Sequence, residues 1–490
     1  MKISIIGAGL GGLSTACLLA AKGHQVSVYE KNSNAGGKMN IQENGDYRFD
    51  TGPSLLTMPF ILEQLFEVCG ANLEHYVELI PLNPVCKYFY RNGTIFNNYE
   101  DTSATLKEIE RIAPEDLVAY SDFLKYTEAL YQKTADAFIF NPLYNFKDLK
   151  ELSIPSFLGI DAFTTVSKRV DQKFNSQYLR KFFKRFTTYN GSSPFLAPAT
   201  LNVIPHVEIN MGGYYVKGGL YKIIEAIFKL AESLGVNFFF NSEIGKIITK
   251  NNTATGIQLA NGEILYSDLV VSNSDATETI NRLIPDSAIS SRKKLRVKTI
   301  EPSCSGFVLM LGIRHKYDQL EHHNIYFSEN YKKEFHEIFE QKIMPDDPTI
   351  YIANTSYTDP THAPAGGSNL FILVNAPYLS NKYDWNEQEK KYGDKVIREL
   401  EKRGLNGLSS HIQFQKSITP KDFYVKYLSN KGSIYGTSSN TRFSAFLRPR
   451  NKSREIDRLY FTGGSTHPGG GIPLVIQSAF NAVNLIDRYE

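Results

Sequence analysis

A glycine-rich turn between a strand and a helix, close to the start of the chain, restricts the fold more than any other feature. Residues 2–6 form a short apolar run, as expected for a strand buried on both faces of a parallel sheet. Gly7, Gly9 and Gly12 follow in G-x-G-x-x-G spacing, which allows a tight turn, a close approach of a pyrophosphate and close packing of the next helix. A second strand ends at Glu30, whose carboxylate can accept hydrogen bonds from a ribose diol. The pattern predicts a dinucleotide-binding βαβ unit; a βαβ unit without a ligand is the alternative, because glycines also mark ordinary turns.

The residues after Glu30 favour one of the two dinucleotides that fit this spacing. NAD and FAD are both compatible with the glycines, but here a second glycine pair, Gly36-Gly37, is followed by Lys38. This extension resembles the FAD-binding segment of flavoproteins of the glutathione-reductase type. We therefore expect FAD.

A turn-prone loop, Gly52-Pro53-Ser54, comes after a β-like run. In flavoproteins of this type a similar loop passes close to the isoalloxazine. A simple connecting turn is the alternative.

The end of the chain carries a second glycine-rich segment. A strand at 459–461 leads to Gly463-Gly464, and the loop 467–473 (HPGGGIP) opens a helix that runs to about Tyr489. Such a loop collects free N–H groups and the positive end of the helix dipole, which favours an anion by about 0.3–1 kcal/mol. In a flavin enzyme the natural anion is the reduced flavin. His467 is the one titratable residue that the sequence places near the ring, either as a proton acceptor or as an anchor of the loop.

The middle of the chain divides by its patterns. Residues 212–292 read as strand, helix, strand, hairpin and strand, which predicts the remainder of a doubly wound cofactor domain. From 293 onward, β-like runs alternate with charged helices, as in a mixed-sheet substrate domain. We therefore expect an α/β fold with a discontinuous Rossmann-like FAD domain, a substrate domain and a helical cap. The expected segments are 1–75, 212–292 and 455–490 for FAD, 76–211 for the substrate-binding cap, and 293–454 for the substrate domain.

One helix of the cap region combines rings and cations. Phe174, Tyr178, Phe182 and Phe186 recur every four residues within the stretch 157–189, with lysines and arginines on both sides. Such a helix can lie in a membrane interface. The alternative is a packing helix whose long cations extend from its edges.

Composition excludes several classes of function. The 490 residues carry a net charge of +3, which gives no basic field for nucleic acid. The four cysteines show no metal-binding spacing and are expected to be reduced and mostly buried; His322 and His323 are interpreted as a surface pair, and no metal is assigned. With the first strand at residue 2 and no run of eighteen apolar residues, we expect neither a signal peptide nor a spanning helix. The expected location is the cytoplasm, with peripheral contact to a membrane.

The motifs at the two ends resemble one family when taken together. LYFTGG before THPGGGIP, AGLGGL before GGK, and FDTGPS are similar to segments of the carotenoid desaturases of the bacterial phytoene-desaturase type, and the likeness spans the chain. The resemblance implies non-covalent FAD, a cap over the flavin, peripheral membrane attachment, and C30 or C40 polyene substrates. Oxygen or a quinone would be the final electron acceptor. The branch of greatest likeness desaturates C-3,4 of 1-hydroxylated carotenoids.

The reaction implied removes a hydride and a proton from a saturated C–C bond beside a conjugated chain. The polyene would spread the positive charge, so a strong protein base is unnecessary, and no acid–base pair stands out in the sequence. Alternatives are a phytoene or diapophytoene desaturase, a carotenoid isomerase or oxidase, an FAD amine oxidase, and a non-catalytic prenyl-lipid carrier. The residues expected to bind FAD are Gly7, Gly9, Leu10, Gly11, Gly12, Glu30, Lys31, Gly36, Gly37, Lys38, Gly52, Pro53, Ser54, Ile244, Gly463, Gly464, Gly470, Gly471 and Ile472.

Overall fold

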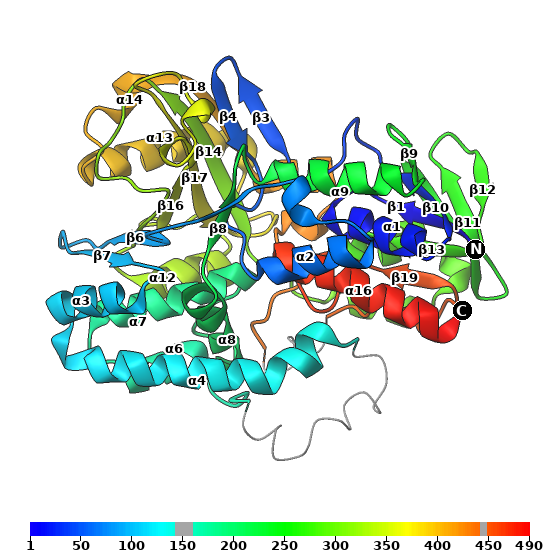
Figure 1. Cartoon of the computed structure of the whole chain (residues 1–490), viewed down its shortest axis with the longest axis horizontal. Helices are drawn as coiled ribbons and strands as arrows, with labels where there is room; N and C mark the ends of the chain where they lie inside the picture. The colour runs from blue at the N-terminus through cyan, green and yellow to red at the C-terminus, as the bar shows by residue number, and fades with distance from the viewer. Residues whose placement is uncertain (143–159, 442–447) are drawn as a thin grey trace.

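The structure, a computed structural model, describes residues 1–142, 160–441 and 448–490. Figure 1 shows a parallel sheet beside both chain ends, a larger sheet on the opposite side, and a layer of helices beneath the larger sheet. The expected α/β fold, with a discontinuous FAD-type domain, a mixed-sheet domain and a helical cap, is confirmed. The boundaries of the five predicted segments stay a prediction.

The cofactor-type domain is built on a five-stranded parallel sheet in the order β19-β13-β1-β2-β9. Its strands come from the beginning, the middle and the end of the chain, so the domain closes only when distant segments meet. In chain order the strands are β1 (Lys2–Ile6), β2 (Gln25–Tyr29), β9 (Asn237–Phe239), β13 (Leu269–Ser272) and β19 (Leu459–Phe461).

Both faces of this sheet are covered, which explains the apolar run of its first strand. Ile3 and Ile5 pack into the core beneath the helices of one face, whereas Ile6 faces the core shared with a small antiparallel sheet. The covering helices are α1 (Leu10–Ala21), α2 (Pro59–Val68), α9 (Tyr221–Ser233) and α16 (Ile472–Tyr489). The small sheet consists of β10 (Ile244–Lys250), β11 (Thr253–Leu259) and β12 (Ile264–Tyr266).

The second domain is built on a seven-stranded mixed sheet in the order β18-β14-β17-β16-β15-β6-β7. One face packs on α13 (Trp385–Lys402), and the other faces the cofactor loops and the helical cap. β6 and β7 pair antiparallel as a hairpin around Asn92-Gly93, a dipeptide typical of such turns. The strands are β6 (Cys86–Phe89), β7 (Ile95–Asn98), β14 (Ser305–Ile313), β15 (His323–Tyr326), β16 (Ile350–Asn354), β17 (Ser368–Ala376) and β18 (Ile412–Ile418).

Short elements join the two domains. The ribbon β3–β4 (Ile41–Asn44 and Tyr47–Asp50) and the pair β5–β8 (Leu79–Pro81 and Tyr214–Val216) connect them. The remaining short helices are α10 (Ala276–Glu278), α11 (Ser291–Lys298), α12 (Tyr331–His336), α14 (Leu408–His411) and α15 (Pro420–Tyr427).

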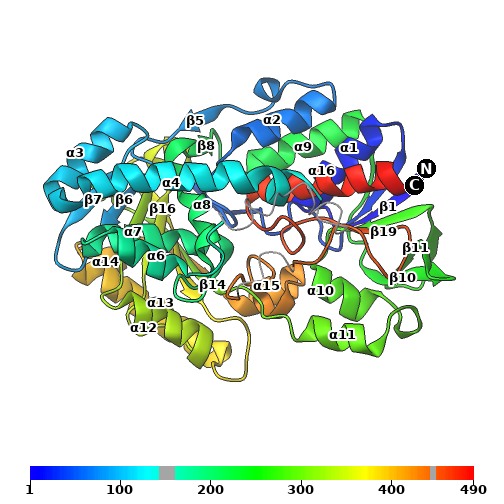
Figure 2. The same cartoon turned by 90° about the horizontal axis from the view of Figure 1, so that it is seen from below.

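The helical cap contains α3 (Thr102–Ile112), α4 (Leu117–Ala135), α6 (Val166–Lys173), α7 (Gln177–Lys184) and α8 (Val203–Pro205). Figures 1 and 2 show α3, α4, α6 and α7 forming a layer beside the β6–β7 end of the larger sheet. Among the described helices, none is long and apolar enough to cross a bilayer.

The prediction of one continuous helix with an exposed aromatic ridge in the cap is wrong. Phe174 has extended backbone and ends α6, and the Ser176 side chain then caps α7. The rings of Phe174, Phe182 and Phe186 are buried against the sheet, and Tyr178 is half-buried. The first residues of the predicted stretch, 157–159, lie outside the described residues.

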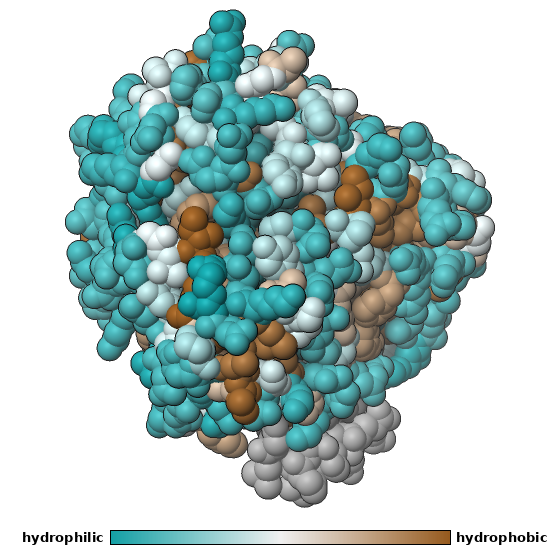
Figure 3. Space-filling model, turned by 60° about the vertical axis from the view of Figure 1, so that its left-hand side comes forward, coloured by the Kyte–Doolittle hydropathy of each residue, from teal (hydrophilic) through white to brown (hydrophobic). Residues whose placement is uncertain are grey.

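Several of the cations beside this ridge also have protein partners. Lys181 donates to the carbonyls of Ser328 and Glu329, and the buried Arg185 pairs with Glu208. Figure 3 brings the left-hand side of Figure 1 forward. On this face the apolar side chains form separate groups, with hydrophilic residues between them. The alternative weighed from the sequence, a packing helix with cations at its edges, therefore describes α7.

Two further expectations concern cysteine and histidine. All four cysteines are buried free thiols, as expected. The interpretation of His322 and His323 as a surface pair is wrong, because both side chains are at most 2% exposed. They lie on and beside β15, an inner strand of the larger sheet, so the sheet and cap cover them.

Candidate functional site

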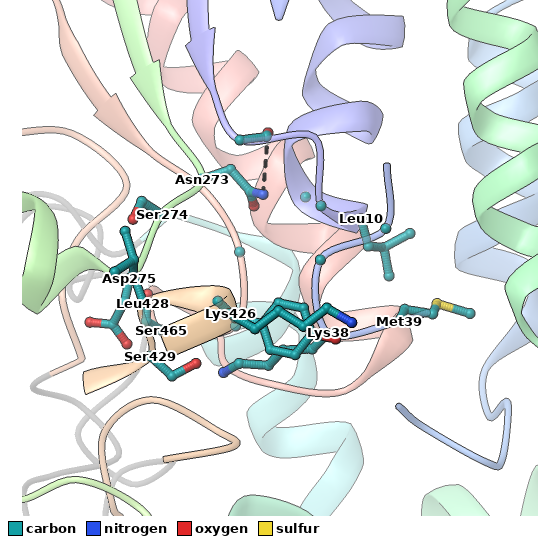
Figure 4. A pocket seen from close by; sticks show the side chains of 18 of the residues that line it. Leu10, Lys38, Met39, Asn273, Ser274, Asp275, Lys426, Leu428, Ser429 and Ser465 are labelled. Atoms are coloured by element: carbon teal, nitrogen blue, oxygen red, sulfur yellow. Dashed lines mark hydrogen bonds between the residues drawn. The ribbon is translucent and has the colours of Figure 1, made fainter. Parts of the chain in front are cut away.

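A cavity of about 320 Å³ lies where the carboxyl ends of the parallel strands face the second domain. Ligands of open α/β sheets bind at this edge. Most of the predicted cofactor residues line the cavity, Leu10 and Lys38 among them (Figure 4), while Gly12, Ser54 and His467 lie outside its lining. The predicted residues that line it are Gly7, Gly9, Leu10, Gly11, Glu30, Lys31, Gly36, Gly37, Lys38, Gly52, Pro53, Ile244, Gly463, Gly464, Gly470, Gly471 and Ile472.

The first glycine loop needs its glycines for space. A Cβ on Gly12 would lie 2.1 Å from the Gly7 carbonyl oxygen, so only glycine allows α1 to start this close to β1. A Cβ on Gly9 would lie 2.8 Å from Asn273 Nδ2. The backbone of this loop therefore stays bare toward the cavity, which is the condition for a pyrophosphate to approach it.

Asn273 joins the two ends of the chain. It follows β13, and its side-chain amide donates to the Gly7 carbonyl at 3.5 Å (Figure 4). A Cβ on Gly11 would meet Asn273 Oδ1 at 2.6 Å, and one on Gly463 would meet the same atom at 2.7 Å. The N-terminal and C-terminal glycine segments thus pack around one side chain from the middle of the chain.

Glu30 is held in place at the end of β2. The Ala8 N–H donates to its Oε2 at 2.9 Å, and the backbone and side-chain N–H groups of Asn32 donate to its Oε1 at 2.9 and 2.7 Å. A carboxylate has about four lone-pair sites, so it retains acceptor capacity toward the cavity that it lines. This arrangement suits the hydroxyls of a ribose.

Two half-buried side chains of opposite charge, Lys38 and Asp275, line the other side of the cavity. Lys38 Nζ donates to the carbonyls of Ser433 and Ile434, each at 3.2 Å. Burial lowers the pKa of Lys38 to about 8, and the Asp275 carboxylate acts against that shift. Burial raises the pKa of Asp275, which is opposed by Lys38 and by backbone N–H donors. Figure 4 shows Asp275 beside Ser274 and Ser429, and Lys38 near Lys426.

The N-terminus of α16, where the sequence predicts an anion site, lies at the cavity. Gly470, Gly471 and Ile472 line the cavity where this eighteen-residue helix begins, and Gly471 has φ +101°. The first N–H groups of a helix lack partners within it and carry positive partial charge. They favour a negatively charged group in this part of the cavity.

His467 lies outside the lining of this cavity. Its backbone N–H donates to the Pro449 carbonyl, and its ring Nε2 lies 3.0 Å from the carbonyl oxygen of Asn141. The side chain is buried, and burial lowers its pKa to about 4. These contacts favour the loop-anchoring interpretation; a role as proton acceptor has no support from its position.

The wall opposite the glycine loops was missed by sequence reasoning. It is apolar and aromatic, and it comes from β14, β17, α15 and the segment after α15. Its main residues are Val308, Phe371, Leu373, Phe423, Tyr427, Ile434 and Tyr435. Strand residues could have been found only with the register of the sheet, whereas Asn273 had a usable signal, since it follows a buried strand of the cofactor domain.

The cavity fits FAD. Bare glycine backbone, a fixed carboxylate at the end of β2, a lysine and a helix N-terminus are the donors and acceptors that a flavin dinucleotide needs.

Comparisons with known proteins agree with this geometry. The sequence model of the family described as flavin containing amine oxidoreductase matches residues 10–487. The chain is 37% identical to a 4,4'-diapolycopene oxygenase from Methylomonas sp over 97% of its own length and 96% of the relative's. It is 36% identical to a 4,4'-diaponeurosporene oxygenase from Staphylococcus haemolyticus, over 100% of this chain and 97% of that protein.

Solved structures show the same fold at low identity. An oxidoreductase from Methanosarcina mazei superposes with a TM-score of 0.66 at 16% identity, covering 99% of this chain and 100% of that chain. The predicted kinship with FAD-dependent flavoproteins is confirmed. A family match over nearly the whole chain, together with full-length relatives, leads to one conclusion: this chain belongs to the flavin-containing amine oxidoreductase family and is an FAD-dependent oxidoreductase.

Proposed function

We propose that this enzyme oxidises a linear carotenoid of the diapocarotenoid class at its terminal region. The observation that supports this most strongly is the 36–37% identity, over nearly full length, to two relatives named as diapocarotenoid oxygenases. The apolar cavity wall is consistent with a hydrocarbon substrate. Bound FAD supplies a two-electron acceptor for such a reaction.

The residues of this chain would position the substrate and exclude water. Val308, Phe371 and Leu373 present apolar side chains toward the cavity from adjacent strands. Among the described residues, this opposite wall contributes Lys426 but no carboxylate to the lining. A cationic amine would meet no counter-charge there, whereas a polyene needs none. The wall therefore favours a polyene over an amine substrate.

The finer prediction from the sequence, desaturation of C-3,4 in a 1-hydroxylated carotenoid, is a second candidate. It rests on an overall likeness of the chain to that branch of the desaturases, with no single diagnostic residue. Terminal oxidation and desaturation place similar demands on the protein, since each requires a polyene end aligned with the cofactor in a dry site. A lipid surface as the source of substrate, with peripheral membrane contact, and oxygen or a quinone as the final acceptor belong to the same proposal.

Expression of the chain in hosts that accumulate different carotenoids tests the proposal. Three hosts are needed, making 4,4'-diapolycopene, phytoene or a 1-hydroxylated carotenoid, and extracted pigments are separated and identified by mass. We expect new aldehyde- or hydroxyl-bearing products in the first host. A product two hydrogens lighter in the third host alone would favour the desaturase, and unchanged pigments in all three hosts from a flavin-loaded protein would contradict both.

A further inference from the structure

The cavity wall continues by one strand beyond its apolar residues. Val308 on β14 pairs with Leu373 on β17, and Leu373 pairs with Tyr351 on β16. Laterally paired residues point to the same face of a sheet, and neighbouring strands are about 4.8 Å apart. Because Val308 and Leu373 line the cavity, Tyr351 lies beside them on the same surface. It is half-buried, where most of its neighbours on β16 are buried.

Tyr351 connects two polar side chains at this position. Its hydroxyl lies 2.6 Å from Ser54 Oγ and 2.7 Å from His323 Nδ1. Ser54 directly follows Pro53, which lines the cofactor cavity, and is itself half-buried. His323 is 2% exposed. The three groups form a hydrogen-bonded chain from inside the sheet to Ser54, the residue next to the lining residue Pro53.

The hydrogen bonds between His323, Tyr351 and Ser54 have a preferred direction of donation. Burial, with added repulsion from His322 and Arg185, holds the pKa of His323 well below its usual value, so the ring is neutral and carries one N–H. Its Nε2 is buried and has no hydrogen-bond partner among the described residues. A proton on Nε2 would leave a buried N–H donor without an acceptor. A proton on Nδ1 leaves only the lone pair of Nε2 without a donor, which proteins tolerate better.

With the proton on Nδ1, each group donates to the next. His323 Nδ1–H donates to Tyr351 Oη, and the Tyr351 hydroxyl donates to Ser54 Oγ. Within the described part of the chain, Tyr351 is the one hydrogen-bond partner of Ser54 Oγ. The hydroxyl hydrogen of Ser54 is then left without an acceptor. Hydrogen bonds in such a chain polarise one another, which strengthens the final donor.

We propose that Ser54, supported by Tyr351 and His323, binds the oxygen of an oxygenated polyene end, such as an aldehyde or a primary alcohol. This inference rests on the proposed function, because it concerns the substrate of the same site. A site that donates to a substrate oxygen discriminates against an analogue that lacks it, since the donor then stays unpaired. These three hydrogen-bonded side chains would make the enzyme prefer partly oxidised carotenoids to the parent hydrocarbon.

Two conservative substitutions and a matched control test this preference. Ser54→Ala removes the final donor, and Tyr351→Phe removes its support while keeping the ring. Tyr326→Phe is the control, because its buried hydroxyl has no partner in the part of the chain that the structure describes. Its ring stacks on Phe89 in the core on the α13 side of the sheet. Each FAD-loaded enzyme is assayed in micelles with 4,4'-diapolycopene and with its mono-aldehyde, and kcat/KM is measured for both.

The readout is the ratio of kcat/KM for the aldehyde to that for the hydrocarbon. We expect both test variants to lower this ratio about three- to tenfold, the range for loss of one neutral hydrogen bond, and Tyr326→Phe to leave it unchanged. An unchanged ratio in Tyr351→Phe with full FAD content overturns the inference. So does a loss of FAD from Ser54→Ala and Tyr351→Phe without a change in the ratio, which would make the flavin the acceptor. A wild-type enzyme that oxidises neither polyene overturns the proposed function and this inference with it.

Discussion

At the scale of single residues, the site depends on positions where no side chain beyond hydrogen fits. Gly11 is such a position, because a Cβ there would lie 2.6 Å from Asn273 Oδ1 and 2.9 Å from the Gly463 backbone nitrogen. We expect Gly11→Ala to lose most of its bound FAD, measured as flavin absorbance per protein after gel filtration. Gly393→Ala is the matched control, since its nearest neighbour would be 3.7 Å away in the helix α13. Equal FAD content in the two variants would contradict this account of the loop.

His467 provides a second test at this scale. We expect His467→Ala to keep its FAD and its oxidation products, because the ring contacts the Asn141 carbonyl and does not line the cavity. The variant should be less stable by about 1–3 kcal/mol through the loss of a buried hydrogen bond. Loss of product without loss of stability would instead support a role in proton transfer.

The pH dependence of stability gives an independent check on His467. Unfolded histidine binds a proton below about pH 6.5, whereas His467 in the folded protein does so only below about 4. Between these values the unfolded state holds more protons, so acid favours unfolding and this contribution to stability is lost as the pH falls. We expect the difference in urea midpoint between wild type and His467→Ala to shrink from pH 7 to pH 4. A constant difference would contradict the buried neutral imidazole.

The residues of the cofactor site could be predicted from the sequence where they belong to a motif of fixed spacing. Gly7, Gly9 and Glu30 follow from a fixed pattern around one strand and one helix. Tyr351 and His323 could not be predicted, because they meet Ser54 only through the pairing of β15, β16 and β17. That pairing depends on long-range contacts, which local patterns do not encode.

At the scale of elements, the aromatic rings of α7 recur with the predicted spacing, but the face that they form is buried and not exposed. The four-residue spacing of its rings is real, but the buried face points to the sheet and the helix starts only after Ser176. We expect Phe182→Ala to destabilise the protein by about 3–5 kcal/mol in chemical unfolding. Val118→Ala, at a side chain that is 73% exposed, should change stability by less than about 0.5 kcal/mol. A small effect of Phe182→Ala would mean that α7 presents this face to solvent or lipid after all.

At the scale of the whole molecule, the cofactor cavity joins segments that are far apart in the sequence. Its lining comes from the first turn of the chain, from β13, from the second domain and from the start of α16. A ligand that binds only this assembled state stabilises it by about 2.7 kcal/mol at a hundredfold excess over Kd. We expect FAD to raise the urea midpoint of flavin-stripped protein, and to leave stripped Gly11→Ala unchanged. A flavin that binds without any shift would place it outside the assembled cavity.

The general architecture could be predicted because each domain has its own pattern. Strand–glycine–helix signals marked the cofactor domain at both ends, and alternating runs marked the mixed sheet. Which face of that sheet is directed at the flavin could not be predicted, because both faces are apolar; α13 covers one of them.

The position of β19 and α16 has a consequence for how the enzyme matures in the cell. Both elements come from the final residues of the chain, yet β19 pairs with β13 and α16 packs on α1. While the ribosome still holds those residues in its exit tunnel, the flavin has no complete binding site. The larger sheet, whose strands end at Ile418, can form earlier. Yellow colour should therefore appear only once the segment that carries β19 and α16 has left the ribosome and can close over the cofactor.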